Sequence, residues 1–223
     1  MSLIFRAELK NTNADVIFIC NPNNPDGTIF SKNELITFFK EKPETTFVID
    51  EAYIEFTNTI ESVVSLTKEY KNLIVVRSLT KTFTIPGLRL GYIVSNILTI
   101  KALLAKKMPW SVNSLAIKAG EYIFKNYEIF QFDVTELIEE TTVFKKQLEL
   151  LNGLKVCKSS TSYFLVELLY ASAKELKEYL IVKHQILIRD ATNFKGLKGE
   201  YIRLSTQSKE ANNALIQAIK EWI

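Results

Sequence analysis

The chain has 223 residues, of which 47% are hydrophobic and 24% are charged, and its formal net charge at pH 7 is +3. This length is enough to bury a core, either in one large domain or in two smaller ones. The small positive charge gives no support for binding to nucleic acid or to a membrane surface. The single histidine, His184, argues against a catalytic triad or a histidine-based zinc site. Any chemistry must therefore come from lysine, arginine, carboxylate and hydroxyl groups.

The cysteines and the hydropathy pattern indicate where the protein works. Cys20 and Cys157 lie in apolar, strand-like stretches, and their spacing matches neither a metal site nor a disulfide framework. Such cysteines favour a reducing compartment. The sequence holds no apolar run of about 18 residues and no signal-peptide layout. We therefore expect a cytoplasmic protein.

In the first part of the chain, predicted strands and helices alternate as in an α/β fold. Apolar runs rich in valine and isoleucine predict strands covered on both faces, at residues 15–20, 45–50, 72–78 and 88–95. Between the first two runs, Ser31 and Glu34 form a capping-box pattern at the start of a helix. Strand, helix and strand in this order predict a mostly parallel sheet with crossover helices.

The second part of the chain predicts a smaller α+β domain carried by a long connecting helix. A helical pattern over residues 113–151 is interrupted near residues 126–130. Strand-like stretches follow it, separated by one helix-like stretch at residues 172–183, and a closing helix is predicted at residues 208–222.

Four segments stand out, and each has an ordinary structural interpretation when taken alone. These interpretations are a turn, a strand end entering a polar loop, a solvated lysine, and an arginine in an interface or an ion pair. The segments are NPNNPDG (21–27), VIDEAYIEF (48–56), SLTKTFTIPGLRLG (78–91) and EYIRLST (200–206). The turn-forming residues of the first and third segments follow predicted strands, which is where α/β proteins place their sites.

Taken together, the four segments supply what a pyridoxal-phosphate site requires. A lysine that binds the carbonyl of this cofactor needs a lowered pKa, which nearby positive charge and desolvation provide. The cofactor also needs an acid beside its pyridine nitrogen and anion-binding groups for its phosphate. An arginine fork suits the carboxylate of an amino-acid substrate.

The motifs Asn-Pro-x-Gly, Asp-x-Ala-Tyr and Ser-x-x-Lys, the last followed eight residues later by arginine, occur here in order. From about residue 14 to the C-terminus, the chain resembles the fold-type I pyridoxal-phosphate enzymes of the aminotransferase class I/II superfamily. The resemblance implies pyridoxal 5'-phosphate as cofactor, a homodimer, and a mostly parallel large-domain sheet with a smaller C-terminal α+β domain. Residues 1–127 would be the remainder of the large domain, and residues 128–223 the connecting helix and the small domain.

The resemblance also implies roles for individual residues. The catalytic residues would be Lys81 as the Schiff-base lysine, Asp50 as the partner of the pyridine nitrogen, and Tyr53. We expect removal of Asp50 to cost far more activity than removal of the adjacent Glu51. The other implied roles concern hydrogen bonding to the ring hydroxyl (Asn24, with Tyr53), the cofactor phosphate (Ser78 and Arg89) and the substrate carboxylate (Arg203). In this family the bond corresponding to Asn24–Pro25 is often cis.

Two departures from the family pattern are visible. Asp26 stands where the family usually has threonine, so the turn is expected to differ in detail. Complete enzymes of this family are also longer, and the resemblance begins only near residue 14. We therefore expect an N-terminal part with the glycine-containing phosphate loop and the ring-stacking aromatic residue to be missing. Without that part, cofactor affinity should be poor.

Local stretches narrow the resemblance to one branch of the superfamily. Residues 50–56 resemble histidinol-phosphate aminotransferases, and residues 109–116 and 187–197 resemble threonine-phosphate decarboxylase of cobalamin biosynthesis. Both enzymes take amino substrates that carry a phosphate, so a second cationic site is implied, with Arg189 as its best candidate. Alternatively, Arg189 is a surface arginine paired with Asp190 or with a helix C-terminus.

The reaction itself stays open at this stage. Loss of the α-proton, with Lys81 as general base, leads to transamination, whereas loss of the carboxylate leads to decarboxylation. The local motifs favour L-threonine O-3-phosphate decarboxylase slightly over an aminotransferase. A different class of protein, a non-catalytic aminotransferase-like regulatory domain or a fragment, is the other alternative. Regulators of that kind carry a basic DNA-binding domain ahead of this fold, and no such domain is visible here.

Overall fold

The computed structural model describes residues 8–223, which form two compact units. The large unit contains residues 8–23 and Ile29–Asp133. The small unit contains Asn24–Thr28 together with Val134–Ile223. The turn at residues 24–28 thus makes its contacts with the C-terminal part of the chain. Among the described residues, no helix is long and apolar enough to cross a membrane.

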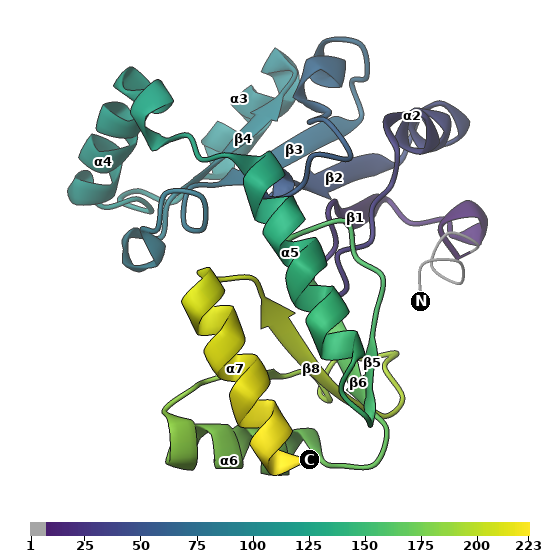
Figure 1. Ribbon diagram of the computed structural model, residues 1–223. Coiled ribbons are helices and arrows are strands. Elements are labelled where there is room, and N and C mark those ends of the chain that lie inside the picture. The colour runs from purple at the N-terminus through teal and green to yellow at the C-terminus, as the bar shows by residue number, and fades with distance from the viewer. Residues whose placement is uncertain (1–7) are drawn as a thin grey trace. The chain divides into compact units, whose positions relative to one another are not determined.

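A four-stranded sheet forms the centre of the large unit (Figure 1). Its strands, in spatial order, are β1 (Val16–Cys20), β2 (Thr46–Asp50), β3 (Leu73–Ser78) and β4 (Gly91–Ser95). The first three are parallel, and β4 runs antiparallel to β3. The predicted mostly parallel sheet is therefore confirmed, although the last strand begins at residue 91 and not at residue 88.

The helices of the large unit begin where side chains cap their free amide groups. At the start of α2 (Lys32–Glu41), Ser31 Oγ accepts from Glu34 N, and Glu34 Oε2 accepts from Ser31 N at 2.8 Å, which confirms the predicted capping box. The helix α3 (Ile97–Lys106) was not predicted; Asn96 Oδ1 accepts from Leu98 N and Thr99 N at its start. The last α-helix of the unit is α4 (Ser114–Lys125).

The core of the large unit lies on one face of the sheet, against α2 (Figure 1). Strand residues on this face pack with residues of α2, namely Ile17, Ile19, Phe47, Ile49, Leu73 and Val75 with Leu35, Phe38 and Phe39. On the other face, the edge strands β1 and β4 leave apolar side chains exposed; Phe18 is 70% exposed and Ile93 is 44% exposed. The prediction that these strands are covered on both faces is therefore wrong for β1 and β4. An apolar run alone does not report which neighbours a strand has.

The small unit follows the predicted order of elements. The predicted interruption is confirmed, because α4 is followed by a 3-10 helix (Tyr127–Phe130) before α5 (Val134–Glu149) begins. The sheet of the small unit is antiparallel, in the order β5-β6-β8-β7. Its strands are β5 (Leu154–Val156), β6 (Tyr163–Leu168), β7 (Arg189–Asp190) and β8 (Glu200–Ser205), with α6 (Ala173–His184) and the closing helix α7 (Lys209–Trp222).

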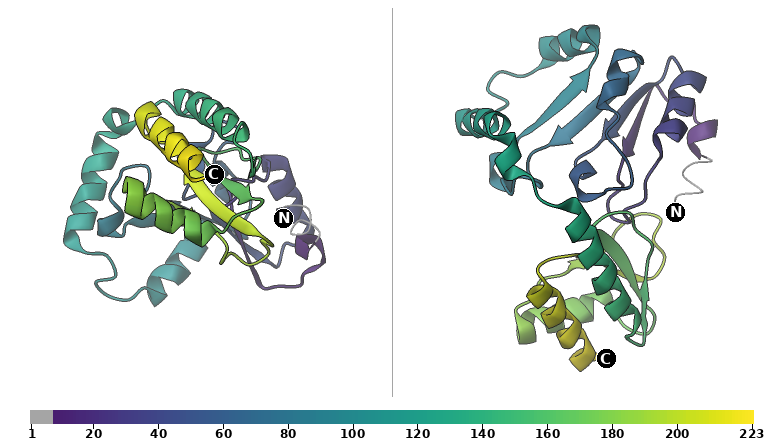
Figure 2. Two further views of the ribbon diagram at one scale, coloured as in Figure 1. Left: turned by 60° about the horizontal axis from the view of Figure 1, so that its bottom comes forward. Right: turned by 45° about the horizontal axis from the view of Figure 1, so that its top comes forward.

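All three helices of the small unit pack on the same face of its sheet (Figure 2). Alternate residues of the two central strands, Phe164, Val166, Leu168, Ile202 and Leu204, form one buried cluster with residues of α5, α6 and α7. Because side chains alternate along a strand, the residues between them project to the opposite face. That alternation decides where Arg203 lies.

Candidate active site

The candidate site residues of the large unit gather at the carboxyl ends of β2 and β3. Phe47 and Ile49 face α2, so alternation directs Asp50 to the other face; Leu73 and Val75 in β3 likewise direct Ser78 to that face. Asp50 Oδ1 accepts a hydrogen bond from Ala52 N at 3.0 Å. The two polar side chains thus lie on the face of the sheet that α2 leaves uncovered.

Cys20 is the register partner of Asp50 across β1 and β2. Its Sγ lies 4.0 Å from Asp50 Oδ2. Partial desolvation, followed by the negative charge of Asp50, raises the pKa of the Cys20 thiol, although Cys20 keeps an exposed surface. This cysteine is therefore a neutral neighbour of the carboxylate at neutral pH, and it is not an activated nucleophile.

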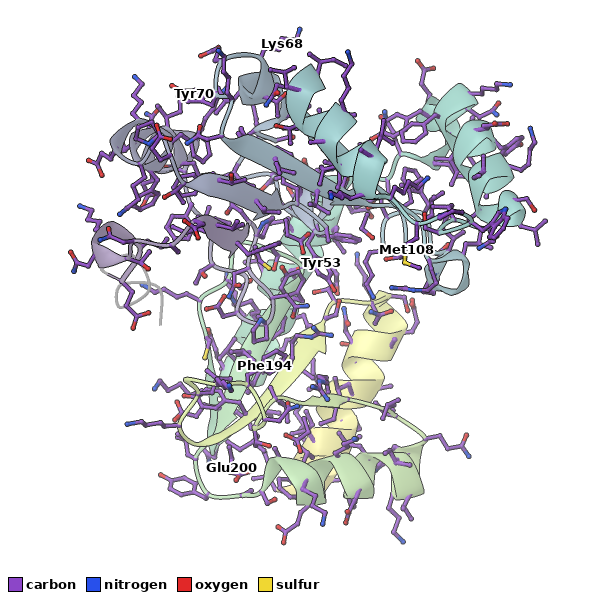
Figure 3. All side chains as sticks on the ribbon, turned by 180° about the vertical axis from the view of Figure 1, so that it is seen from behind. Tyr53, Lys68, Tyr70, Met108, Phe194 and Glu200 are labelled. Atoms are coloured by element: carbon purple, nitrogen blue, oxygen red, sulfur yellow. The ribbon has the colours of Figure 1, made fainter. Side chains whose placement is uncertain are left out.

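Tyr53 and Lys81 follow these strand ends. Tyr53 lies at the end of the sheet opposite to Lys68 and Tyr70, as Figure 3 shows. The Lys81 side chain is exposed, and no residue in the described range 8–223 makes a hydrogen bond or ion pair with its amine. The amine is thus accessible to a carbonyl group beside the rim that carries Asp50, but the desolvation expected from the sequence is not provided by the described residues.

The segment after Lys81 turns sharply before it enters β4. Thr84 and Arg89 have left-handed backbone conformations, with φ of 52° and 54°, which are uncommon for residues other than glycine. The exposed Arg89 donates from Nη1 to Pro86 O at 3.0 Å. A Cβ at Gly91 would lie 2.7 Å from Arg77 O, so only glycine allows β4 to approach β3 this closely. Close packing of the two strands thus explains why position 91 is a glycine.

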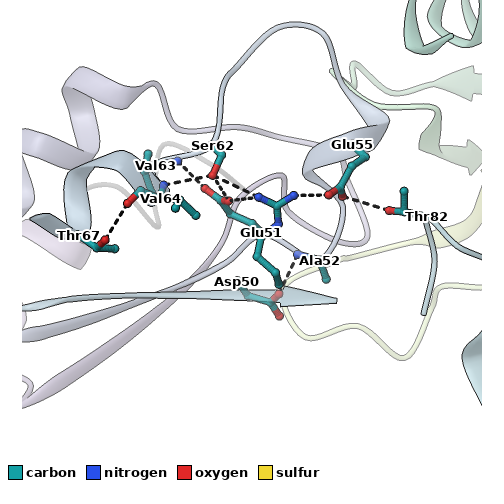
Figure 4. Close-up of polar contacts among 10 residues, drawn as sticks. Asp50, Glu51, Ala52, Glu55, Ser62, Val63, Val64, Thr67 and Thr82 are labelled. Carbon is teal, nitrogen blue, oxygen red and sulfur yellow. Dashed lines mark hydrogen bonds and ion pairs between the residues drawn. The ribbon is translucent and has the colours of Figure 1, made fainter. Parts of the chain in front are cut away.

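Behind Asp50, on the α2 face, Glu51 is fully buried and hydrogen-bonded (Figure 4). Glu51 Oε2 accepts from Ser62 Oγ at 2.6 Å, and Oε1 accepts from Val63 N at 2.7 Å. Arg77, which alternation in β3 directs to the same face, lies 3.4 Å from Glu51 Oε2 and also pairs with Glu55. Burial raises the pKa of Glu51, although its hydrogen bonds and Arg77 oppose that shift.

The role of Glu51 was missed in the sequence, where it appeared only as a comparison for Asp50. A usable signal was present: two adjacent acids at the end of a strand must point to opposite faces, so one of them had to enter the core. A buried carboxylate needs a partner, and the arginine in the neighbouring strand run, Arg77, was the available cation. Loss of Glu51 is therefore expected to disturb the fold and is no neutral control for loss of Asp50.

In the small unit, Arg203 and Arg189 lie side by side on the face of the sheet that the helices leave uncovered. Arg203 lies between Ile202 and Leu204, which both face the helices, so its own side chain projects to the other face. Arg189 is its direct register partner in the antiparallel pair of β7 and β8. Directly opposite residues of such a pair share a face of the sheet. Two guanidinium side chains thus project from neighbouring strands.

The two arginines have different surroundings. Arg203 is half-buried and donates from Nη1 to Asn24 Oδ1 at 2.6 Å. Arg189 is exposed, donates to Asn193 Oδ1 at 3.0 Å and lies 5.5 Å from the ring centroid of Phe194, within the range of a cation–π contact. Asp190, the partner considered for Arg189, accepts from Thr192 N and Oγ1 instead. These hydrogen bonds from Thr192, and to a smaller extent the charges of Lys177 and Arg189, lower the pKa of Asp190.

The turn that carries Asn24 is tightly packed in the small unit. Gly27 has a φ of 66°, and a Cβ there would lie 1.9 Å from Ser159 Oγ. Gly27 O accepts from Ser160 N at 3.0 Å. The glycine of the Asn-Pro-x-Gly motif is therefore required by both its backbone conformation and its close contact.

The peptide bond expected to be cis at Asn24–Pro25 is not; the cis bond is Asn21–Pro22. The motif contains two Asn–Pro bonds, and every such bond has a similar intrinsic preference, so the sequence could not distinguish them. At the substituted position, Asp26 Oδ1 accepts from Thr28 N and Thr28 Oγ1 at 3.0 and 2.9 Å. The aspartate thus closes a local turn of its own.

The chemistry of these groups fits the cofactor that the sequence implied. A carboxylate, a hydroxyl and an exposed amine that follow the strand ends of the large sheet suit the pyridine nitrogen, the phosphate and the carbonyl of pyridoxal phosphate, respectively. Two arginines on one face of the small sheet suit a molecule with two anionic groups. Architecturally, this is an α/β protein whose candidate site residues follow the carboxyl ends of its parallel strands.

The chain belongs to the aminotransferase class I and II family, whose model matches residues 3–219. It is 34% identical over 217 residues to a histidinol-phosphate aminotransferase of Caldanaerobacter subterraneus subsp. tengcongensis, covering 97% of this chain and 60% of that protein. The crystal structure of L-threonine-O-3-phosphate decarboxylase from Porphyromonas gingivalis is 38% identical with a TM-score of 0.90, covering 95% of this chain and 65% of that one. The histidinol-phosphate aminotransferase structure from Clostridium acetobutylicum is 30% identical with a TM-score of 0.85, covering 99% and 66%.

These similarities confirm the predicted family and fold class. The chain spans about 60% of the length of the curated relative and about two thirds of each solved structure. Relatives of both kinds named in the sequence analysis, aminotransferase and decarboxylase, are similar to it.

Replacement of Glu51 by glutamine tests the buried network through its pH dependence. Because folding raises the pKa of Glu51 above its ordinary value of 4.5, the folded state holds the proton more tightly than the unfolded chain. The resulting stabilisation is fully present below that value and is lost as the pH rises through the raised pKa. We expect the free energy of unfolding of the wild type, minus that of Glu51→Gln, to decrease as the pH rises above 4.5.

Urea titrations of both proteins at a series of pH values measure this difference, and groups that titrate equally in both proteins cancel. A difference that increases with pH would show that Arg77 and the hydrogen bonds outweigh burial.

Proposed function

We propose that the protein is a pyridoxal-phosphate-dependent enzyme that acts on a phosphorylated amino substrate. The observation that carries this proposal is the pairing of Arg189 with Arg203 on one face of the small sheet, in a family member that also presents Lys81 and Asp50 at a sheet rim. A carboxylate and a phosphate on one small molecule would use both arginines. The family likeness supplies the cofactor.

The residues of the chain would hold the cofactor through complementary charges. When bound, pyridoxal phosphate supplies an electron sink for negative charge on the α-carbon of the substrate. Asp50 would hold the proton on the pyridine nitrogen, and Lys81 would bind the carbonyl carbon. Asn24 and Tyr53 would form hydrogen bonds to the ring hydroxyl. Ser78 and Arg89 would contact the phosphate.

Lys81 is the group we assign to move a proton at the α-carbon. Its amine is exposed, and no described residue holds it in an ion pair; in its neutral form such an amine accepts a proton and returns it. Arg203 would bind the α-carboxylate through its guanidinium fork, with Asn24 Oδ1 fixing the orientation of that fork from the side. Arg189, one strand further, would bind the distal phosphate.

The similarity to the Porphyromonas gingivalis enzyme, at 38% identity and a TM-score of 0.90, supports L-threonine O-3-phosphate decarboxylase as the more specific proposal. A histidinol-phosphate-type aminotransferase is the second candidate, supported by the 34% identical relative. We also propose that the full-length protein is a cytoplasmic homodimer, a state that sedimentation velocity measures directly. The division into a large-domain part, 1–127, and a small domain with its connecting helix, 128–223, stays a prediction.

Two parallel assays of the full-length protein separate the candidate functions. The first assay supplies L-threonine O-3-phosphate alone. The second supplies glutamate together with a ketone phosphate, the compound that transamination converts into histidinol phosphate. Release of carbon dioxide without any need for a keto acid is expected for the decarboxylase. Formation of 2-oxoglutarate from glutamate supports the aminotransferase instead. A protein that binds the cofactor and is inert in both assays would favour the non-catalytic alternative.

Replacement of each arginine by alanine tests their separate roles. Arg203→Ala is expected to lower kcat/KM for every amino-acid substrate, by about 2–5 kcal/mol of transition-state stabilisation, because the carboxylate loses its charged partner. Arg189→Ala is expected to lower kcat/KM for phosphorylated substrates only. Turnover of L-threonine O-3-phosphate and of plain L-threonine is measured for both variants.

Lys174→Ala is the matched control, because it removes one positive charge from an exposed position on α6, outside the two-arginine face. If Arg189→Ala affects both substrates equally, the assignment of Arg189 to the phosphate is wrong.

A further inference from the structure

A chain of polar contacts runs from the buried carboxylate of Glu51 to the residue beside Lys81 (Figure 4). Glu51 is fixed by Ser62 and by the backbone of Val63, and its side chain is only 1% exposed. Ser62 Oγ also accepts from Val64 N at 3.1 Å. The first member of the chain of contacts is therefore anchored in the core of the large unit.

Arg77 links this anchor to a second carboxylate. Its Nη1 lies 3.4 Å from Glu51 Oε2, and its Nη2 donates to Glu55 Oε1. Burial lowers the pKa of Arg77, but the charges of Glu55, Tyr92 and Glu51 and the hydrogen bond to Glu55 together outweigh it, so the pKa of Arg77 is raised. A guanidinium that is 14% exposed and pairs with two carboxylates has one preferred geometry, because its donors form a rigid fork.

Glu55 extends the contacts to the segment that carries Lys81. Its Oε2 accepts a hydrogen bond from Thr82 Oγ1 at 3.2 Å. Thr82 directly follows Lys81, whose own side chain is exposed and makes no hydrogen bond or ion pair with any described residue. The position of the Lys81 backbone is thus tied, through one hydroxyl, to a carboxylate held by Arg77.

We propose that Glu55, held by Arg77, is a positioning residue that fixes the Lys81 segment through Thr82. This inference rests on the proposed function, in which the Lys81 amine binds the cofactor carbonyl. A lysine side chain has several rotatable bonds, and the cofactor-bound state requires one narrow range of amine positions. Fixing the backbone beside it reduces the ordering that cofactor binding must impose.

The experiment uses the full-length protein freed of cofactor and compares Thr82→Val with Thr82→Ser. Valine keeps the shape of threonine but removes the hydroxyl, whereas serine keeps the hydroxyl. The dissociation constant for pyridoxal phosphate is measured from the absorbance band that appears when a lysine amine binds its carbonyl. We expect Thr82→Val to weaken binding about three- to tenfold, which corresponds to one lost hydrogen bond, and Thr82→Ser to match the wild type.

Glu55→Gln provides a second route to the same contact. Glutamine keeps an acceptor oxygen but lacks the charge that orients Arg77, so we expect weakened cofactor binding here too. The double variant Glu55→Gln, Thr82→Val should bind pyridoxal phosphate no more weakly than the weaker-binding single variant, because both substitutions break the same contact between Glu55 and Thr82. Thr142→Val is the control, since it removes an exposed hydroxyl that bonds to Ile138 O within α5.

Thermal unfolding of each cofactor-free variant separates positioning from folding. A lower midpoint for Thr82→Val together with an unchanged dissociation constant overturns the proposal, because the contact then serves the fold alone. A band that is absent in the wild type, or that persists in Lys81→Ala, overturns the proposed function and this inference with it. A band that depends on Lys81 but is insensitive to Thr82 and Glu55 overturns only the positioning role.

Discussion

The opposed placement of two adjacent acids at the end of β2 is the constraint on which the large unit depends. Asp50 ends the strand on the face that α2 leaves uncovered, and Glu51 turns into the core, because successive side chains alternate. A buried carboxylate is costly without partners, so Ser62, Val63 and Arg77 surround it. The same arginine reaches Glu55 and, through it, the segment of Lys81. One buried charge thus supports the rim on which the proposed chemistry takes place.

In the small unit, the main electrostatic feature is a pair of arginines on one face of the sheet. Its helices bury one face of the antiparallel sheet, and its other face brings two arginines together in register. Like charges at this spacing repel each other, and Asn24 and Asn193 offer only neutral acceptors. No carboxylate among the described residues forms an ion pair with either arginine, although the charge of Asp190 acts on Arg189. This arrangement suits an anionic ligand, and the proposed substrate would supply one carboxylate and one phosphate.

Much of this organisation could be predicted from the sequence because it depends on local signals. The capping box at Ser31 and the parallel strands followed from patterns within a few residues of each other. The cis bond at Asn21–Pro22 and the exposed side of β1 depend on tertiary neighbours, and both were predicted wrongly. The contacts of Glu51 with Arg77, and the register of Arg189 with Arg203, join residues distant along the chain. Alternation predicts which face each residue takes, but only the fold fixes the partner.

The location of the covalent cofactor attachment tests the central claim most directly. Borohydride reduction of the full-length protein with bound pyridoxal phosphate makes the lysine bond permanent, and mass spectrometry of its peptides locates the label. The account predicts a label at Lys81, and none in Lys81→Ala. A label at another lysine, such as Lys68 or Lys101, or equal labelling in the alanine variant, would contradict it.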